Sequence, residues 1–400
     1  MMPQPGSSST LRRRLMLTVV SLVLMLLVVV GILVINGSTT GKQTTTAPHQ
    51  NSLASSTPTA PASPLLFGTN LGLFNGNDQV VTSAATRALM QQMHIRIVRV
   101  PMRTHLPNDI AVQALQAVKS IGAMPLIVLT GMRNPNVRAD DTRMIQDANN
   151  VFGNNLVYYE FGNEDDWNGL TITRYTDGWN MLIPQFKRLA LNGKFIGPVS
   201  YEYNSDNLTS FLQRANPRPD MISWHEYTCS YKEPAGNCLS NLDGWTTHIS
   251  DARAVMQNTL GTTLPIMITE WNYAADQSTQ PNGLPLDDGK YNNASFMTEW
   301  TTKALRILAA NQVFASMQYS VTNTALPLIT FRDELTIQGE TFQSLYQTMV
   351  HEASRSAEGT GSGGPGTAAL CRGVGCPHFS SSFSGWGGEK DFAKPRTQKG

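Results

Sequence analysis

Eight short apolar runs, each followed by an amphipathic stretch, fill the middle of this 400-residue chain and predict an α/β fold. Most of the runs are apolar throughout rather than alternating, as expected for parallel strands covered on both faces. The segment that holds them, residues 64–353, has the size of one barrel of eight strand–helix units. Together these observations favour a closed (β/α)8 TIM barrel over an open sheet.

The N-terminal region predicts a membrane anchor. Residues 15–35 carry no charge over 21 positions, long enough to cross a bilayer, and three arginines at 12–14 precede them. A cleaved signal peptide is the alternative, but its apolar core would be shorter and would end at a small-x-small site. We therefore expect residues 1–14 in the cytoplasm and the barrel outside the cell, attached to the cell membrane; a secreted protein is the alternative.

Two further segments are too biased in composition to form a core. Residues 36–63 are rich in Ser, Thr, Pro and Ala and predict a disordered linker. Residues 354–400 are rich in Gly and Ser and predict a low-complexity, disordered tail. Cys371 and Cys376 in this tail favour a small loop disulfide or an incidental pair over a zinc site. The net charge of +1 gives no indication of a nucleic-acid partner.

The predicted strands are short runs dominated by apolar residues, many of them β-branched or aromatic. In chain order they are Leu66–Leu73, Ile95–Met102, Met124–Thr130, Leu156–Gly162, Lys194–Val199, Met221–His225, Pro265–Thr269 and Phe314–Ser320. An open doubly wound sheet is the less favoured alternative, because residues 68–72 lack the glycine spacing of a dinucleotide-binding turn.

Amphipathic stretches between the strands predict the helices. They are Thr82–Met93, Asp109–Ile121, Asp140–Phe152, Thr173–Leu191, Asp206–Ala215, Thr246–Leu260, Ala294–Ala310 and Thr341–Val350. Asn108 is expected to cap the second helix and Gly122 to close it. Pro184 is expected to kink the fourth helix, because it lacks the backbone donor and its ring crowds the preceding turn.

A cluster of acids follows the fourth strand, where the sequence VYYEFGNEDDW spans Val157–Trp167. In a barrel of this type, reactive groups lie at the carboxyl ends of the strands. The residues expected at those ends are Arg99 and Arg103 from the second strand, Asn163 and Glu164 from the fourth, His225 and Tyr227 from the sixth, Glu270, Trp271 and Asn272 from the seventh, and Gln318 and Tyr319 from the eighth.

Two of these residues form a pair of carboxylates. Glu164 and Glu270 end the fourth and seventh strands, which lie nearly opposite one another around a ring of eight. Cleavage of a glycosidic bond needs such a pair, one group protonated to donate to the leaving oxygen and one ionised to attack or to activate water. The sequence therefore favours a glycosidase.

The same residues resemble clan A of the glycoside hydrolases. The matching motifs are Asn163-Glu164, His225-x-Tyr227 and Glu270 on the expected strands, together with Arg99 on the second strand. The resemblance covers residues 64–353 and implies a retaining enzyme in which Glu164 is the acid/base and Glu270 the nucleophile. The EFGNE and TEWN sequences are similar to xylosidase-, arabinofuranosidase- and β-glucuronidase-type families, and the HxY sequence to the cellulase-type family.

Supporting roles are expected for the neighbours of the two glutamates. Asn163 would bond the sugar 2-hydroxyl, and Tyr227 would donate to the nucleophile and lower its pKa. Arg99 would pair with the nucleophile or with Glu160, as a substrate-binding group or as part of a structural ion pair. His225 would contact the sugar or merely fill the barrel rim.

Aromatic residues and cysteines near the strand ends complete the predicted site. Trp167 and Trp271 are candidates for stacking on sugar rings, although a single Trp often serves packing alone. Many clan A members have a Trp on the eighth strand, and this chain has Gln318-Tyr319 there instead. Cys229 and Cys238 are expected to form a disulfide that pins the loop after the sixth strand; two free thiols are the alternative.

The expected function is hydrolysis of an extracellular polysaccharide or oligosaccharide, without a metal or cofactor. A metal-dependent hydrolase is less favoured, because the chain has seven His and the first strand carries no HxH pair. A non-catalytic carbohydrate-binding barrel would hold a glycan without cutting it, and a transglycosylase would use the same residues to transfer a sugar. Xylan, arabinan, glucan, mannan and uronic-acid polymers all fit the sequence as substrates.

Overall fold

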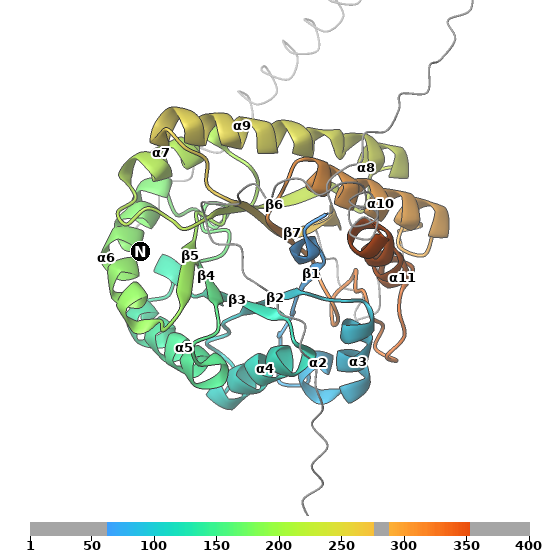
Figure 1. The fold of residues 1–400 in the computed structure, drawn as a ribbon, viewed down its shortest axis with the longest axis horizontal. Helices are drawn as coiled ribbons and strands as arrows, with labels where there is room; N and C mark the ends of the chain where they lie inside the picture. The colour runs from blue at the N-terminus through green and yellow to red at the C-terminus, as the bar shows by residue number, and fades with distance from the viewer. Residues whose placement is uncertain (1–61, 276–287, 353–400) are drawn as a thin grey trace, which may run out of the picture. The chain divides into compact units, whose positions relative to one another are not determined.

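The fold is known from a computed structural model that describes residues 62–275 and 288–352. Eight parallel strands form one sheet in the order β5-β4-β3-β2-β1-β8-β7-β6, and helices surround it (Figure 1). The strands are β1 (Gly68–Asn70), β2 (Ile97–Pro101), β3 (Met124–Leu129), β4 (Val157–Phe161), β5 (Gly193–Ile196), β6 (Ile222–Cys229), β7 (Ile266–Ala274) and β8 (Ala315–Gln318).

The sheet closes on itself between β5 and β6. Two parallel bridges join these edge strands, Ile196 to Met221 and Ser200 to Trp224. Since β1 pairs with both β2 and β8, the order of the strands runs once around the ring. This closure confirms the predicted (β/α)8 TIM barrel.

The helices that cover the barrel follow the predicted alternation. They are η1 (Pro64–Leu66), α2 (Gln79–Thr82), α3 (Ala84–Gln92), α4 (Asn108–Ile121), η2 (Gly131–Arg133), α5 (Val137–Phe152), α6 (Ile172–Leu189), α7 (Ser205–Arg214), α8 (Ala235–Asn241), α9 (Asp243–Leu260), α10 (Ala294–Ala310), α11 (Ile337–Tyr346) and η3 (Gln347–Glu352). Among the described residues, no helix is long and apolar enough to span a membrane.

Helix ends show where local signals acted as expected and where they did not. Gly122 closes α4 in the left-handed conformation, as predicted. Asn108 does not cap this helix, because it is the first helical residue and Pro107 occupies the capping position. Ser83 ends α2 and caps α3 through its side chain, which splits the first predicted helix. The helix α6 continues through Pro184.

Alternation along the strands separates two buried layers. Outward-facing strand side chains such as Phe161 pack against helix side chains such as Trp179 of α6, and each large aromatic buries roughly 150–250 Å² there. Inward-facing side chains such as Ile97 and Tyr158 fill the lower part of the barrel. Two positions further toward the carboxyl ends of the same strands, the inward-facing residues are charged. The polar site therefore lies above this apolar layer.

The predicted anchor (15–35), the cytoplasmic tail (1–14), most of the linker (36–63) and the C-terminal tail (354–400) lie outside the described residues, and so do Cys371 and Cys376. These remain predictions. The described helices and strands run from Pro64 to Glu352.

Candidate active site

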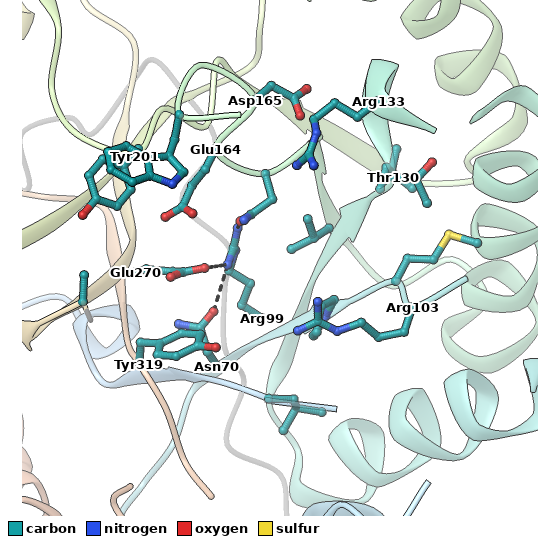
Figure 2. Close-up of a pocket in the computed structure, with 18 of the residues that line it drawn as sticks. Asn70, Arg99, Arg103, Thr130, Arg133, Glu164, Asp165, Tyr201, Glu270 and Tyr319 are labelled. Atoms are coloured by element: carbon teal, nitrogen blue, oxygen red, sulfur yellow. Dashed lines mark hydrogen bonds and ion pairs between the residues drawn. The ribbon is translucent and has the colours of Figure 1, made fainter. Parts of the chain in front are cut away.

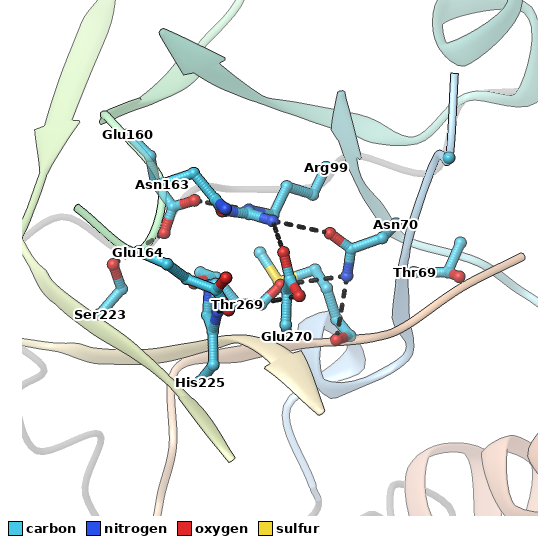
Figure 3. A network of polar contacts seen from close by, with 12 residues as sticks. Thr69, Asn70, Arg99, Glu160, Asn163, Glu164, Ser223, His225, Thr269 and Glu270 are labelled. Carbon is cyan, nitrogen blue, oxygen red and sulfur yellow. Dashed lines mark hydrogen bonds and ion pairs between the residues drawn. The ribbon is translucent and has the colours of Figure 1, made fainter. Parts of the chain in front are cut away.

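Arg99, on β2, is the centre of a buried polar network at the carboxyl ends of the strands (Figure 3). Its Nε donates to Glu160 at 2.5 Å, and its Nη2 donates to Asn163 at 2.6 Å. Its Nη1 donates to Asn70 at 3.1 Å and also contacts Glu270. Burial alone would lower the pKa of Arg99, but Glu160 and Glu270 outweigh burial and raise it. Arg99 therefore pairs with both of the carboxylates expected as its partners.

A second layer of hydrogen bonds fixes the partners of Arg99. The Ser223 hydroxyl, on β6, donates to the other oxygen of Glu160 at 2.7 Å. The Asn70 amide donates to backbone carbonyls of Thr269 at 3.1 Å and of Met317 at 3.2 Å. Because a buried polar group without a partner is costly, these contacts allow a charged network to persist inside the barrel.

Glu270 is held in its ionised form. One carboxylate oxygen contacts Arg99, and the other accepts a hydrogen bond from the Tyr227 hydroxyl at 2.8 Å. Burial opposes ionisation, but the charges of His225 and Arg99 and the hydrogen bond from Tyr227 together lower the pKa of Glu270. Only 10% of its side chain is exposed, at the mouth of the barrel.

Glu164 lies in a different environment, on the turn that follows β4. Gly162 allows this turn, with a φ of 87°, and a Cβ there would lie 2.5 Å from Asp165 Oδ2. Glu164 itself has a φ of 49°, a conformation that side chains other than glycine rarely adopt. Its backbone amide donates to Val199 at 3.0 Å, and Asn168 donates to its carbonyl, which anchors the turn.

The two glutamates meet at His225. His225 Nδ1 lies 2.7 Å from Glu164 Oε1 and 3.8 Å from Glu270 Oε2. One nitrogen of His225 and one oxygen from each glutamate all lie within 4.8 Å of one another. Burial lowers the pKa of His225, but Glu270 and Glu164 act in the opposite direction and the net effect is to raise it.

This trio is also the set of described residues whose geometry could hold a metal ion. However, Glu270 already contacts the Arg99 guanidinium, so a divalent cation would add charge beside a buried cation. The donor set therefore suits proton transfer and nucleophilic attack better than metal binding.

Two predicted sugar contacts have to be corrected. The His225 side chain is fully buried and does not line the cavity, so it supports Glu164 rather than facing the open mouth. Trp271 is fully buried too, with its ring packed against Trp245, Trp300 and Phe342. The strand β7 continues through Glu270, and the residue after an inward glutamate must point outward.

A cavity of about 1110 Å³ opens above the polar network (Figure 2). Glu164, Glu270 and Tyr227 line it, and so do Asn163 and Trp167. Trp167 is 69% exposed. The centroid of its ring lies 4.5 Å from the centroid of the Tyr201 ring. This pair forms an aromatic wall beside the acids, of the kind that stacks on sugars.

The loop after β6 forms part of the same rim. Cys229 and Cys238 are joined by the predicted disulfide, and Cys229 lines the cavity. The short helix α8 lies inside this loop and was not predicted. The Trp300 indole donates to the Cys238 carbonyl at 3.2 Å, which ties the loop to α10.

Several cavity residues do not stand out in the sequence. Asn70 could have been recognised as the amide side chain at the end of the first strand. Arg133, Asp165 and Tyr201 lie on connections whose paths toward the cavity only the fold reveals. Burial raises the pKa of Asp165 to about 7, although Arg133 opposes the shift.

Comparison with known proteins indicates the fold but no close relative. No model of a known protein family matches the chain, and no curated protein does. The family 51 α-L-arabinofuranosidase AbfB from Bifidobacterium longum is similar in structure, with TM-score 0.55, 12% identity and coverage of 72% of this chain and 74% of that one. A monomeric β-xylosidase from Caulobacter crescentus CB15 gives TM-score 0.55, 12% identity and coverage of 72% and 69%.

A third similar structure, N2152 from Neocallimastix frontalis, is 21% identical, with TM-score 0.44, over 65% of this chain and 61% of that one. The value of 0.44 is too low to support an argument. The other two structures are an arabinofuranosidase and a xylosidase, and at 12% identity their similarity shows a shared fold. The chain therefore shares the fold of clan A glycoside hydrolases.

Proposed function

We propose that this protein is a retaining glycosidase that hydrolyses O-glycosidic bonds of an extracellular polysaccharide or oligosaccharide. The observation that carries the proposal is the pair Glu164 and Glu270, with one oxygen from each within 4.8 Å across the cavity mouth. Retaining enzymes hold their carboxyl groups about 5–5.5 Å apart, whereas inverting enzymes need about 6.5–9.5 Å to admit a water.

Glu270 is the proposed nucleophile. The environment that lowers its pKa keeps it ionised, and the bonds from Arg99 and Tyr227 fix its orientation. In the first step its oxygen forms a bond to the anomeric carbon while the bond to the leaving oxygen breaks. A covalent glycosyl-enzyme results.

Glu164 is the proposed acid/base. It donates a proton to the leaving oxygen in the first step, and in the second it removes a proton from the water that displaces Glu270. The contact with His225 at 2.7 Å places its carboxyl group for both steps. Asn163, which accepts a hydrogen bond from Arg99, is proposed to bond the sugar 2-hydroxyl. Trp167, which lines the cavity, is proposed to stack on a neighbouring sugar.

Variants of the two glutamates test this assignment on a panel of aryl glycosides. Glu270→Ala should lose turnover, and azide should then give a glycosyl azide of inverted configuration. Glu164→Ala should still react with substrates that have good leaving groups, and azide should give a product of retained configuration. Proton NMR of the first sugar released by the wild type decides the stereochemistry.

Four outcomes would contradict the proposal. An inverted first product would exclude double displacement. Full activity of Glu164→Ala would show that another group is the acid. Binding of glycans without cleavage would favour a carbohydrate-binding barrel, whereas products longer than the substrate would favour a transglycosylase.

A further inference from the structure

Two arginines on one wall of the cavity have no part in the double displacement. Arg103 follows β2, and Arg133 ends the short helix η2 that follows β3. Both line the cavity, and Figure 2 shows their guanidinium groups directed toward its centre, on the side away from Tyr201. The wall that carries Trp167 and Tyr201 is aromatic, so the two walls differ in charge.

Arg103 is only partly satisfied by the protein. Its Nη2 donates to the Gly72 carbonyl at 2.9 Å, and its guanidinium carbon lies 4.9 Å from the centre of the Phe74 ring. Its Nε is buried and has no hydrogen-bond partner within residues 62–275 and 288–352. No carboxylate of those residues lies within ion-pair distance of it. Burial, with a contribution from Arg99, lowers the pKa of Arg103, although Tyr319 and Glu270 act in the opposite direction.

Arg133 also keeps its charge toward the cavity. Arg133 acts on Asp165, a buried carboxyl that also lines the cavity and whose pKa is raised to about 7. Asp165 is therefore only partly ionised at neutral pH and neutralises Arg133 incompletely. In the described part of the chain, Arg133 forms no ion pair within 4.0 Å.

The remaining cation of the cavity is already neutralised. Arg99 contacts both Glu160 and Glu270, so it has no charge to offer a ligand. The carboxyl group of Glu164 contacts His225. The cavity therefore carries an excess of positive charge on the wall formed by Arg103 and Arg133, in a site where two carboxylates would otherwise repel an anion.

We propose that the sugar attacked by Glu270 is anionic, bearing a carboxylate as in a uronic acid or a sulfate ester, that Arg103 binds this group, and that Arg133 adds to the positive field of the same cavity. The inference rests on the proposed glycosidase function and specifies its substrate. Arg103 lines the same cavity as Glu270, and its guanidinium group is directed toward the centre of that cavity, which is why the anion is assigned to the reacting sugar. A guanidinium offers paired donors that match carboxylate and sulfate oxygens.

The test compares matched aryl glycosides that differ only at carbon 6: glucoside, glucuronide and glucoside 6-sulfate, with the galacto series beside them. The wild type should cleave an anionic member at least tenfold faster, in kcat/KM, than its neutral counterpart. Added salt should lower this preference, because it screens the attraction. Preference for the uronide or for the sulfate ester identifies which anion the site takes.

Arg103→Met should lower kcat/KM for the anionic substrate by roughly 10–100-fold, as expected for loss of a charged hydrogen bond, and should leave the neutral one within about threefold. Arg133→Met should show the same selectivity with a smaller effect, and Arg103→Lys should recover part of the loss. Arg332→Met is the matched control, because Arg332 also lies over a phenylalanine ring, Phe331, but does not line the cavity.

Equal loss on both substrates in Arg103→Met would overturn the inference and assign Arg103 a structural role in holding Gly72 and Phe74. A wild type that prefers neutral glycosides would overturn it while the glycosidase function stands. If no glycoside is cleaved, the proposed function fails, and titration calorimetry with the same aryl compounds still tests the inference. If the wild type binds the anionic compounds more tightly than the neutral ones, and Arg103→Met abolishes this difference, the inference is supported.

Discussion

At the scale of single residues, the two glutamates differ because their neighbours differ. Glu270 accepts from Arg99 and Tyr227 inside the barrel, whereas Glu164 is partly exposed and contacts His225. Identical side chains thus acquire the two roles that glycosidic cleavage requires. The sequence predicted both positions, since each follows an apolar strand directly. It could not predict that the His225 side chain would be buried away from the cavity, because burial depends on packing from other strands.

The hydroxyl of Tyr227 gives a prediction about pH. It donates to Glu270 at 2.8 Å and helps to lower the pKa of that carboxyl. Removing it in Tyr227→Phe raises this pKa, so the acidic limb of the kcat/KM profile should move to higher pH. The same loss of a charged hydrogen bond should reduce kcat/KM by roughly tenfold at neutral pH.

The pH profile with one aryl glycoside measures this effect. Tyr203→Phe is the control, because its hydroxyl donates to Asp251 at 2.7 Å outside the cavity, and its acidic limb should stay in place. An unchanged limb in Tyr227→Phe would show that the tyrosine does not control ionisation of Glu270.

At the scale of elements, strand positions were predictable and strand ends were not. Continuous apolar runs predicted all eight strands, but the apolar pattern stops at His225 in β6 and at Thr269 in β7, before the true ends at Cys229 and Ala274. Polar residues interrupt such a pattern, although here the network around Arg99 satisfies them inside the sheet. Trp271 points outward because β7 has a register shift between Ile268 and Trp271; without this shift, alternation from the inward-facing Met267 would turn Trp271 inward.

The disulfide gives a prediction about the stability of one element. Cys229 and Cys238 are separated by nine positions and close a loop that ends inside α8. Replacing both with Ser should lower the free energy of unfolding by about 2–3 kcal/mol, since a loop of this length is restricted in the unfolded chain. Urea unfolding measures the change.

Reduction provides the matched comparison for this variant. A reducing agent should destabilise the wild type by a similar amount and leave the double Ser variant unaffected. Because Cys229 lines the cavity, the variant should also show a higher KM with kcat largely retained. A variant as stable as the oxidised wild type would contradict the prediction.

At the scale of the whole molecule, the eight-fold alternation predicted the barrel, and the closure between β5 and β6 needed the structure. Only two bridges join these edge strands, and no local pattern in the sequence identifies such partners. The charge of the cavity wall also belongs to this scale. Arg103 and Arg133 come from two different connections, and their shared cavity appears only when the ring is closed.

The placement of the molecule relative to the membrane is the last prediction. The uncharged run at 15–35 and the arginines at 12–14 predict a cytoplasmic N-terminus and an external barrel, where a polymeric sugar would be accessible. Protease added to intact cells should therefore remove the barrel and spare a tag placed before residue 1. A variant with Glu at positions 12–14 should insert into the membrane less uniformly in this orientation, because the positive charges set the orientation. Release of the full barrel into the medium would instead favour cleavage and secretion, and protection of the barrel with loss of the tag would reverse the topology.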